Sequence, residues 1–119
     1  IDALFAGETM ADFVAALEAD SSDLAARTLK AIRHNSPLSM ASTLAMLRPA
    51  PASLAEALKQ EYRWTWRSME RSDFIEGVRA LLIDKDRNPR WRHDAPDAVP
   101  DADVAAMLES LGENELTFP

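Results

Sequence analysis

The side chains that could carry catalysis in this sequence are few and stand apart from one another. His34 ends an apolar-periodic segment and His93 lies in a proline-rich stretch, and neither faces a metal-binding partner at i, i+4 on a helix. The serines mostly precede helical segments, where a hydroxyl caps free backbone N–H groups: Ser21, Ser22, Ser36, Ser53 and Ser72. We therefore expect no metal site, and no catalytic residue within this chain.

Most of the 20 aspartates and glutamates lie on polar helix faces or in a late acidic stretch, where solvation is the default. Glu61 is different, because it falls inside the apolar arc of a helical segment. A buried carboxylate needs a partner, and Arg63, Arg67 or Arg79 would supply one. We expect a structural ion pair at Glu61, with a catalytic acid as the alternative.

A basic cluster is the arrangement best suited to a ligand. Its members fall within eight residues: Lys85, Arg87, Arg90, Trp91 and Arg92. One interpretation is structural, with cations favoured at a helix C-terminus and a tryptophan that anchors the chain. The other is a phosphate site beside an apolar surface, suited to a nucleotide-bearing ligand. The residues by themselves favour the structural interpretation.

The elements that must position these residues are helical. Apolar side chains recur at helical spacing in six segments: residues 10–19, 22–34, 36–47, 53–71, 73–83 and 103–111. No alternation is long enough to predict a strand. Residues 94–102 form a proline-rich acidic linker before the last helix, and "PAP" at 49–51 breaks the chain earlier. We predict an all-α fold of five to six helices.

Two of the predicted helices carry apolar surfaces that we expect to contact another part of the protein or another molecule. Segment 36–47 is apolar on several sides, including Met40 and Leu44, so we expect a further neighbour there. In segment 53–71, one arc holds the apolar side chains Leu54, Leu58, Tyr62, Trp66 and Met69. Trp64 points to the opposite side, and we expect it to face outward. Met40, Leu44, Trp64 and Trp66 are the candidate interface residues. The stripe from Phe74 to Leu82 is expected to form core.

Composition narrows the classes of partner. The chain has 119 residues and a net charge of −7, which argues against nucleic acid as a general partner. No apolar run reaches the ~20 residues that span a membrane, so no membrane contact is expected. The chain has no cysteine, which fits a cytoplasmic protein. Because it opens on Ile1, we expect a processed chain or a piece of a longer one.

Three stretches carry a specific resemblance: "SPLSMASTLAML", "EYRWTWRSM" and "DFIEGVRALLIDKDRNPRW", in this order. They resemble the C-terminal part of 3-hydroxyisobutyryl-CoA hydrolases, in the crotonase (enoyl-CoA hydratase/isomerase) superfamily. The resemblance implies that residues 1–119 are one C-terminal helical domain. The catalytic β/α spiral core and its oxyanion hole would belong to the missing part of the parent.

The same resemblance implies an enzyme that hydrolyses a short-chain β-hydroxyacyl-CoA thioester in valine catabolism. No cofactor would be bound tightly, and coenzyme A would enter as part of the substrate. The expected partners are the acyl-CoA, the chain's own N-terminal core and further copies in a homo-oligomer. This chain alone would be inactive. The alternatives are an enoyl-CoA hydratase or isomerase parent, and a free-standing helical interaction module.

In the superfamily an aromatic residue and a lysine of the last matching helix approach the adenosine and phosphate of CoA. Here the aromatic position holds Leu81, and the lysine position holds Asp84 with Lys85 directly after it. The resemblance therefore implies a CoA-facing edge made by the basic cluster, with Lys85, Arg87, Arg90 and Trp91 as its candidate residues.

Overall fold

The computed structural model describes residues 2–48 and 50–119, so the expectations that fall on Ile1 and Pro49 lie outside the described residues. Within these ranges six α-helices form and no strand, which confirms the all-α class. They are α1 (Met10–Ala19), α2 (Asp23–His34), α3 (Pro37–Leu47), α4 (Leu54–Arg71), α5 (Phe74–Val78) and α6 (Asp101–Leu108). Short helical turns accompany them: η1 (Asp2–Phe5), the π-helical η2 (Arg79–Ile83), η3 (Pro96–Ala98) and η4 (Gly112–Asn114).

Hydroxyl side chains begin four of the helices, three of them at serines that the sequence predicts as caps. Thr9 accepts from the amide of Asp12, whose carboxylate accepts from Thr9 in return, closing a capping box at α1. Ser22, Ser36 and Ser53 each accept from a backbone amide in the first turn of α2, α3 and α4. These capping bonds satisfy N–H groups that the first turn of a helix leaves free.

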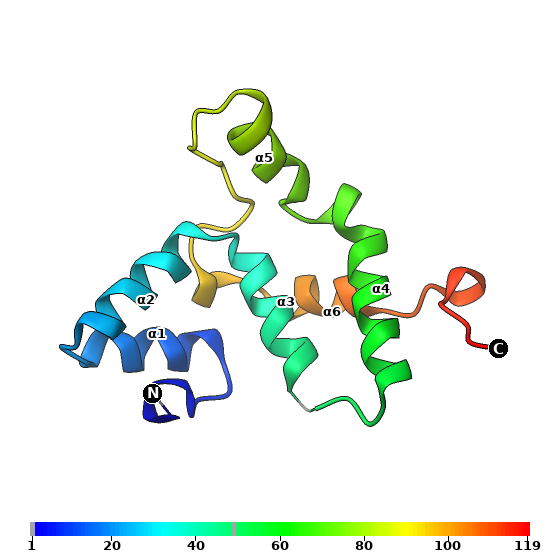
Figure 1. Cartoon of the computed structure of the whole chain (residues 1–119), viewed down its shortest axis with the longest axis horizontal. Helices are drawn as coiled ribbons and strands as arrows, with labels where there is room; N and C mark the ends of the chain where they lie inside the picture. Colours follow the sequence, from blue (N-terminus) through cyan, green and yellow to red (C-terminus); the bar gives the residue numbers. More distant parts are fainter. Residues whose placement is uncertain (1, 49) are drawn as a thin grey trace.

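The core lies between η1, α1 and α2, and α3 covers it. Its buried members are Leu4, Met10, Phe13, Leu17, Ala25 and Ile32. Met40 and Leu44 of α3 pack against this cluster. Because α3 also contacts α4, α6 and η3, it is the central helix of the chain (Figure 1). Neighbours within the chain cover part of its apolar circumference, while Leu47 is 65% exposed, and the further neighbour stays a prediction.

The inner side of α4 makes polar contacts with the region of α6. Arg63 Nε lies 2.8 Å from Glu115 Oε2. Arg67 donates to the backbone oxygens of Met107 and Ser110, at 3.2 Å each, and so completes the C-terminus of α6. The predicted ion pair at Glu61 is wrong, because these arginines are engaged elsewhere and Glu61 is exposed.

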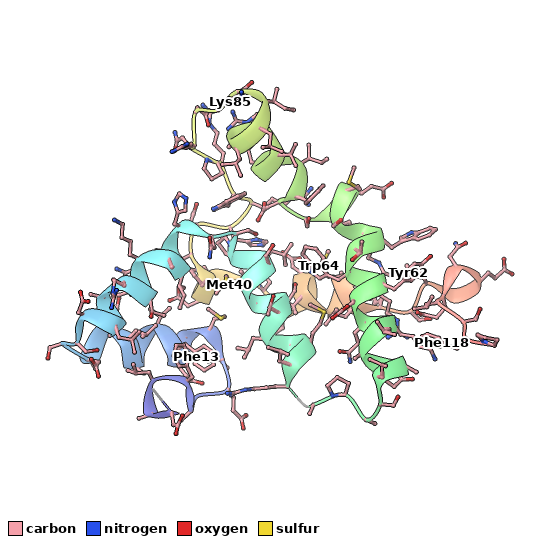
Figure 2. All side chains as sticks on the ribbon, in the orientation of Figure 1. Phe13, Met40, Tyr62, Trp64, Lys85 and Phe118 are labelled. Carbon is pink, nitrogen blue, oxygen red and sulfur yellow. The ribbon has the colours of Figure 1, made fainter. Side chains whose placement is uncertain are left out.

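The apolar arc of α4 faces away from the rest of the chain. Leu54, Leu58, Trp66 and Met69 are exposed. Trp64 lies on the opposite side from Tyr62, toward α3 (Figure 2), and its indole nitrogen is buried. The expected outward direction of Trp64 is therefore wrong. The expectation assumed that the apolar arc meets the core, whereas α4 contacts its neighbours through Trp64 and two arginines.

The segment α5–η2, residues 74–83, projects from the body as an arm (Figure 1). Ser72 interrupts the helix before it, since its hydroxyl donates to Ser68 O and accepts from the amide of Phe74. The apolar side chains of the arm are exposed: Phe74, Ile75, Leu81, Leu82 and Ile83. The prediction that this stripe forms core is wrong for the described chain, because no element of it covers the outer side of the arm.

The molecule is flatter and more open than a compact domain of this length. It measures 50 × 38 × 23 Å, and its radius of gyration is 15.7 Å, against ~13.5 Å expected from chain length. Its exposed surface is 8003 Å², against ~6400 Å² for a compact protein of this mass. An excess of exposed surface is expected of helices that pack against another body.

Residues 94–102 pack against the helices and do not form an extended linker. They contain η3, whose Pro96 is buried, and α6 already begins at Asp101. η3 contacts both α1 and α3. Within residues 2–48 and 50–119 no helix is long and apolar enough to cross a membrane.

Candidate functional site

The first four residues of the basic cluster, Lys85 to Trp91, lie in a loop, residues 84–91, that leaves the end of the arm and returns to the body. We name this segment the basic loop; Lys85 lies near its tip (Figure 2). Lys85 and Arg87 adopt positive φ angles of 56° and 53°, which side-chain-bearing residues seldom adopt. The side chains of Lys85, Arg87 and Arg90 are all exposed. The loop thus presents three cations on a tightly folded backbone.

Acidic side chains of the arm and loop converge on Arg79. Its guanidinium lies 2.7 Å from Glu76 Oε1, 2.6 Å from Asp84 Oδ2 and 2.8 Å from Asp86 Oδ2. The hydrogen bonds from Arg79, with a further one from the amide of Arg90, lower the pKa of Glu76 to about 2. The Arg79 hydrogen bond also holds the pKa of Asp86 below its usual value. Glu76 and Asp86 therefore remain ionised at neutral pH.

Trp91 fixes the returning end of the loop. Its indole N–H donates to His34 O over 3.0 Å, joining the loop to the end of α2. Its ring lies beside Gly77, where an added Cβ would stand 3.5 Å from the indole. This is the anchoring role that the structural interpretation of the cluster assigned to the tryptophan.

A buried joint connects the arm to the body. Asp73, 3% exposed, accepts from Ser36 Oγ at 2.6 Å and from the amide of Arg92 at 2.9 Å. The guanidinium of Arg92 donates to Glu70 O and Arg71 O, and so completes the C-terminus of α4. Ser36 therefore both caps α3 and holds Asp73. The joint fixes where the arm and the basic loop leave the body.

An apolar groove of about 540 Å³ runs between the arm, the basic loop and the α2–α3 junction. Its walls include Trp64, Phe74, Val78, Leu82 and Trp91, with Leu81 and Arg87 also lining it. Leu81, at the position where the superfamily carries an aromatic residue, thus lies on the same groove as Arg87. The structure brings an apolar surface and a cation together, an arrangement suited to binding.

The matching family model describes enoyl-CoA hydratase/isomerase and covers residues 1–108. The chain belongs to the enoyl-CoA hydratase/isomerase family. This confirms the resemblance to the crotonase superfamily. Curated relatives include the mitochondrial 3-hydroxyisobutyryl-CoA hydrolases of Gallus gallus, 41% identical over 98% of this chain, and Homo sapiens, 37% identical over 99%. The chain spans only 30% and 31% of the length of these two relatives.

Two solved structures share this arrangement of helices. An enoyl-CoA hydratase from Rhodobacter sphaeroides is 52% identical, with a TM-score of 0.92 over 98% of this chain and 35% of that one. A carnitinyl-CoA dehydratase from Mycobacterium thermoresistibile is 36% identical with a TM-score of 0.86, and 34% of its chain is covered. The all-helical chain therefore corresponds to about a third of a crotonase-type enzyme.

The expected cytoplasmic location is wrong. The 3-hydroxyisobutyryl-CoA hydrolases to which the chain is similar are named as mitochondrial, which contradicts that expectation. Absence of cysteine excludes disulfides, but it does not distinguish between compartments that keep thiols reduced.

Three structural features of this chain were not predicted from its sequence. The i, i+3 spacing of Glu76 and Arg79 signals an ion pair, but it does not show that the loop carboxylates join it. The role of Asp73 depends on Ser36, which lies 37 residues away. His93 Nε2 lies 2.8 Å from Asp103 Oδ2. The two residues are ten positions apart in the sequence, so their spacing does not predict this contact. Among residues 2–48 and 50–119, no group of acidic residues and histidines could hold a metal ion.

Proposed function

We propose that this chain is the C-terminal helical part of an enzyme that hydrolyses the thioester of 3-hydroxyisobutyryl-CoA, a reaction of valine catabolism. The observation that carries the proposal is similarity over 98–99% of the chain to 3-hydroxyisobutyryl-CoA hydrolases. Water would cleave the thioester to give 3-hydroxyisobutyrate and free coenzyme A. Coenzyme A would be part of the substrate and not a resident cofactor.

In this proposal the chain binds coenzyme A and covers its site, and another part of the enzyme performs the chemistry. The basic loop, with Lys85, Arg87 and Arg90, forms the CoA-facing edge, and Trp91 holds it in place. The exposed apolar side of the arm packs on the catalytic core. A hydrolase needs hydrogen-bond donors aimed at the oxyanion of the tetrahedral intermediate, and the core would supply them. This chain alone is expected to be inactive.

The test is turnover of 3-hydroxyisobutyryl-CoA by the full-length protein, followed by release of the free thiol. Thiol release at an enzymatic rate supports the proposal. The isolated chain serves as the negative control. Hydrolysis by it would contradict the proposal that another part of the enzyme performs the chemistry. Full-length protein that releases no thiol would overturn the hydrolase assignment.

Enoyl-CoA hydration is the second candidate, and one observation favours it. The solved structure that is 52% identical to this chain is titled an enoyl-CoA hydratase. Hydration adds water across the carbon–carbon double bond and leaves the thioester intact. Crotonyl-CoA therefore separates the two reactions: a hydratase consumes the enoyl absorbance without releasing thiol, whereas a hydrolase releases thiol.

We also propose that the outer face of α4 lies in a contact between copies of the enzyme. Trp66 is 51% exposed, and Leu54, Leu58 and Met69 continue its stripe. Exposed apolar patches of this kind mark interaction surfaces. The test is light scattering of full-length Trp66→Glu beside Ala26→Glu, which adds the same charge to an exposed position on α2. Loss of the oligomer in the Trp66 variant alone supports the contact; unchanged mass in both overturns it.

A further inference from the structure

Arg79 is the centre of a cage formed by the arm and the basic loop. Besides the three carboxylates, its guanidinium donates to Asn88 O at 3.3 Å. Glu76 Oε1, already bound to Arg79, accepts from the amide of Arg90 at 2.7 Å. One side chain thereby ties together the first turn of η2 and both halves of the returning loop.

The cage holds the loop backbone in a shape that it would not adopt alone. Residues with side chains keep a positive φ only where their surroundings hold them. Lys85 and Arg87 both do so, and each follows a carboxylate that is bound to Arg79. The amide of Arg87 also donates to Ala80 O at 3.0 Å, folding the loop back onto the arm.

The cage also separates charges of opposite sign. Asp84 and Asp86 alternate with Lys85 and Arg87 in the sequence and would neutralise them in an extended chain. In the structure both carboxylates turn inward to Arg79. Lys85, Arg87 and Arg90 make no ion pair with any described residue. A chain with a net charge of −7 therefore presents a basic edge at this loop.

We infer that Arg79 is a positioning residue for phosphate recognition: it holds the loop carboxylates inward so that Lys85 and Arg87 face an anionic ligand. It touches no substrate itself. The inference rests on the proposed function, because CoA is the ligand whose nucleotide phosphates the loop would meet. It predicts that Arg79 affects binding of the nucleotide end of CoA and leaves the acyl chemistry unchanged.

The experiment uses the full-length protein and compares Arg79→Met with Arg79→Lys. Lysine keeps the charge but lacks the planar fork of donors, so it should restore the cage only in part. Arg27→Met is the matched control, because Arg27 is an exposed arginine that pairs with Asp23 in the first turns of α2, whereas the loop is anchored at the opposite end of that helix. Each variant is assayed with the acyl-CoA and with the same acyl thioester of pantetheine, which lacks the nucleotide phosphates.

For Arg79→Met we expect KM for the acyl-CoA to rise roughly tenfold, which corresponds to about 1.4 kcal/mol. Its kcat should stay unchanged, and so should its KM for the pantetheine thioester. Arg79→Lys should fall between wild type and Arg79→Met, and Arg27→Met should match wild type. Equal losses with both thioesters, or a fall in kcat, would show that Arg79 only maintains the fold and would overturn the inference.

Calorimetry with coenzyme A alone separates this inference from the proposed reaction. Wild-type protein that lacks hydrolase activity but binds CoA about tenfold more tightly than Arg79→Met would refute the reaction and support the cage. Wild-type protein that is active but binds CoA no better than Arg79→Met would refute the cage. Absence of CoA binding by the wild type would refute both.

Discussion

In α1 the apolar side chains Met10, Phe13 and Leu17 are buried, whereas Phe74, Leu81 and Leu82 of the arm are exposed. Both segments carry apolar residues at the same helical spacing. The difference lies in what surrounds them, because η1, α2 and α3 cover α1 and no described element covers the outer arm. Periodicity thus identifies the residues that share a face, and it does not identify the body that meets that face.

The first and largest test of this comparison is truncation of one leucine in each region. Leu17, 2% exposed, lies among core residues, so Leu17→Ala should lower the free energy of unfolding by about 2–5 kcal/mol. Leu82, 62% exposed, has little burial to lose, and Leu82→Ala should change it by less than about 0.5 kcal/mol. Urea denaturation of the isolated chain measures both. A loss for Leu82→Ala that matched Leu17→Ala would refute the comparison.

The second test concerns the joint between the two regions. Asp73→Ala should leave the hydroxyl of Ser36 and the amide of Arg92 without their acceptor, at a cost of about 1–3 kcal/mol. Asp73→Asn retains a carbonyl acceptor and should cost less. Amide hydrogen exchange would show faster exchange in the arm before the core helices. Equal acceleration in α1 would mean that Asp73 stabilises the whole chain.

The third test is acidification, which should affect the arm first. Glu76 has its pKa lowered to about 2 by Arg79, below the usual value near 4.5. A lowered folded-state pKa contributes stability that is present above pH ~4.5 and lost as the pH falls to about 2. We expect the amide resonance of Arg90, which donates to Glu76, to shift in this window. Glu76→Gln should remove that pH dependence, and an unchanged profile would contradict the assignment.

The smallest effect is expected at Gly77 in α5. An added Cβ would meet the Trp91 ring at 3.5 Å, an ordinary contact distance, so the site has room for alanine. Since glycine within a helix costs about 1 kcal/mol relative to alanine, Gly77→Ala should stabilise the arm by up to roughly that amount. Hydrogen exchange of α5 measures it. Faster hydrogen exchange of α5 in Gly77→Ala would show that the Trp91 ring cannot accommodate the added methyl group.

Local patterns predicted the helices well, because capping hydroxyls and proline breakers act within a few residues. Ser22, Ser36 and Ser53 cap the helices that they precede. The direction of the α4 stripe was not predictable from its residues, because Trp64 and the arginines, and not Leu54 or Trp66, make the inner contacts.

The candidate site was predictable in composition but not in form. The run from Lys85 to Trp91 identified the loop and its anchoring tryptophan. The inward turn of Asp84 and Asp86 was hidden, since it depends on backbone angles and on Arg79. In the linear sequence these aspartates alternate with the cations from which the fold separates them.

The contact of Arg67 with the end of α6 bears on the order of folding. α6 has eight residues, and its N-cap residue, Pro100, makes no side-chain capping bond; helices this short are marginal in isolation. Arg67, forty residues earlier in the chain, binds the carbonyl of Met107. We therefore expect α6 to become stable after α4 has formed and approached it. Kinetic hydrogen-exchange labelling during refolding should show the amides of α6 gaining protection after those of α4.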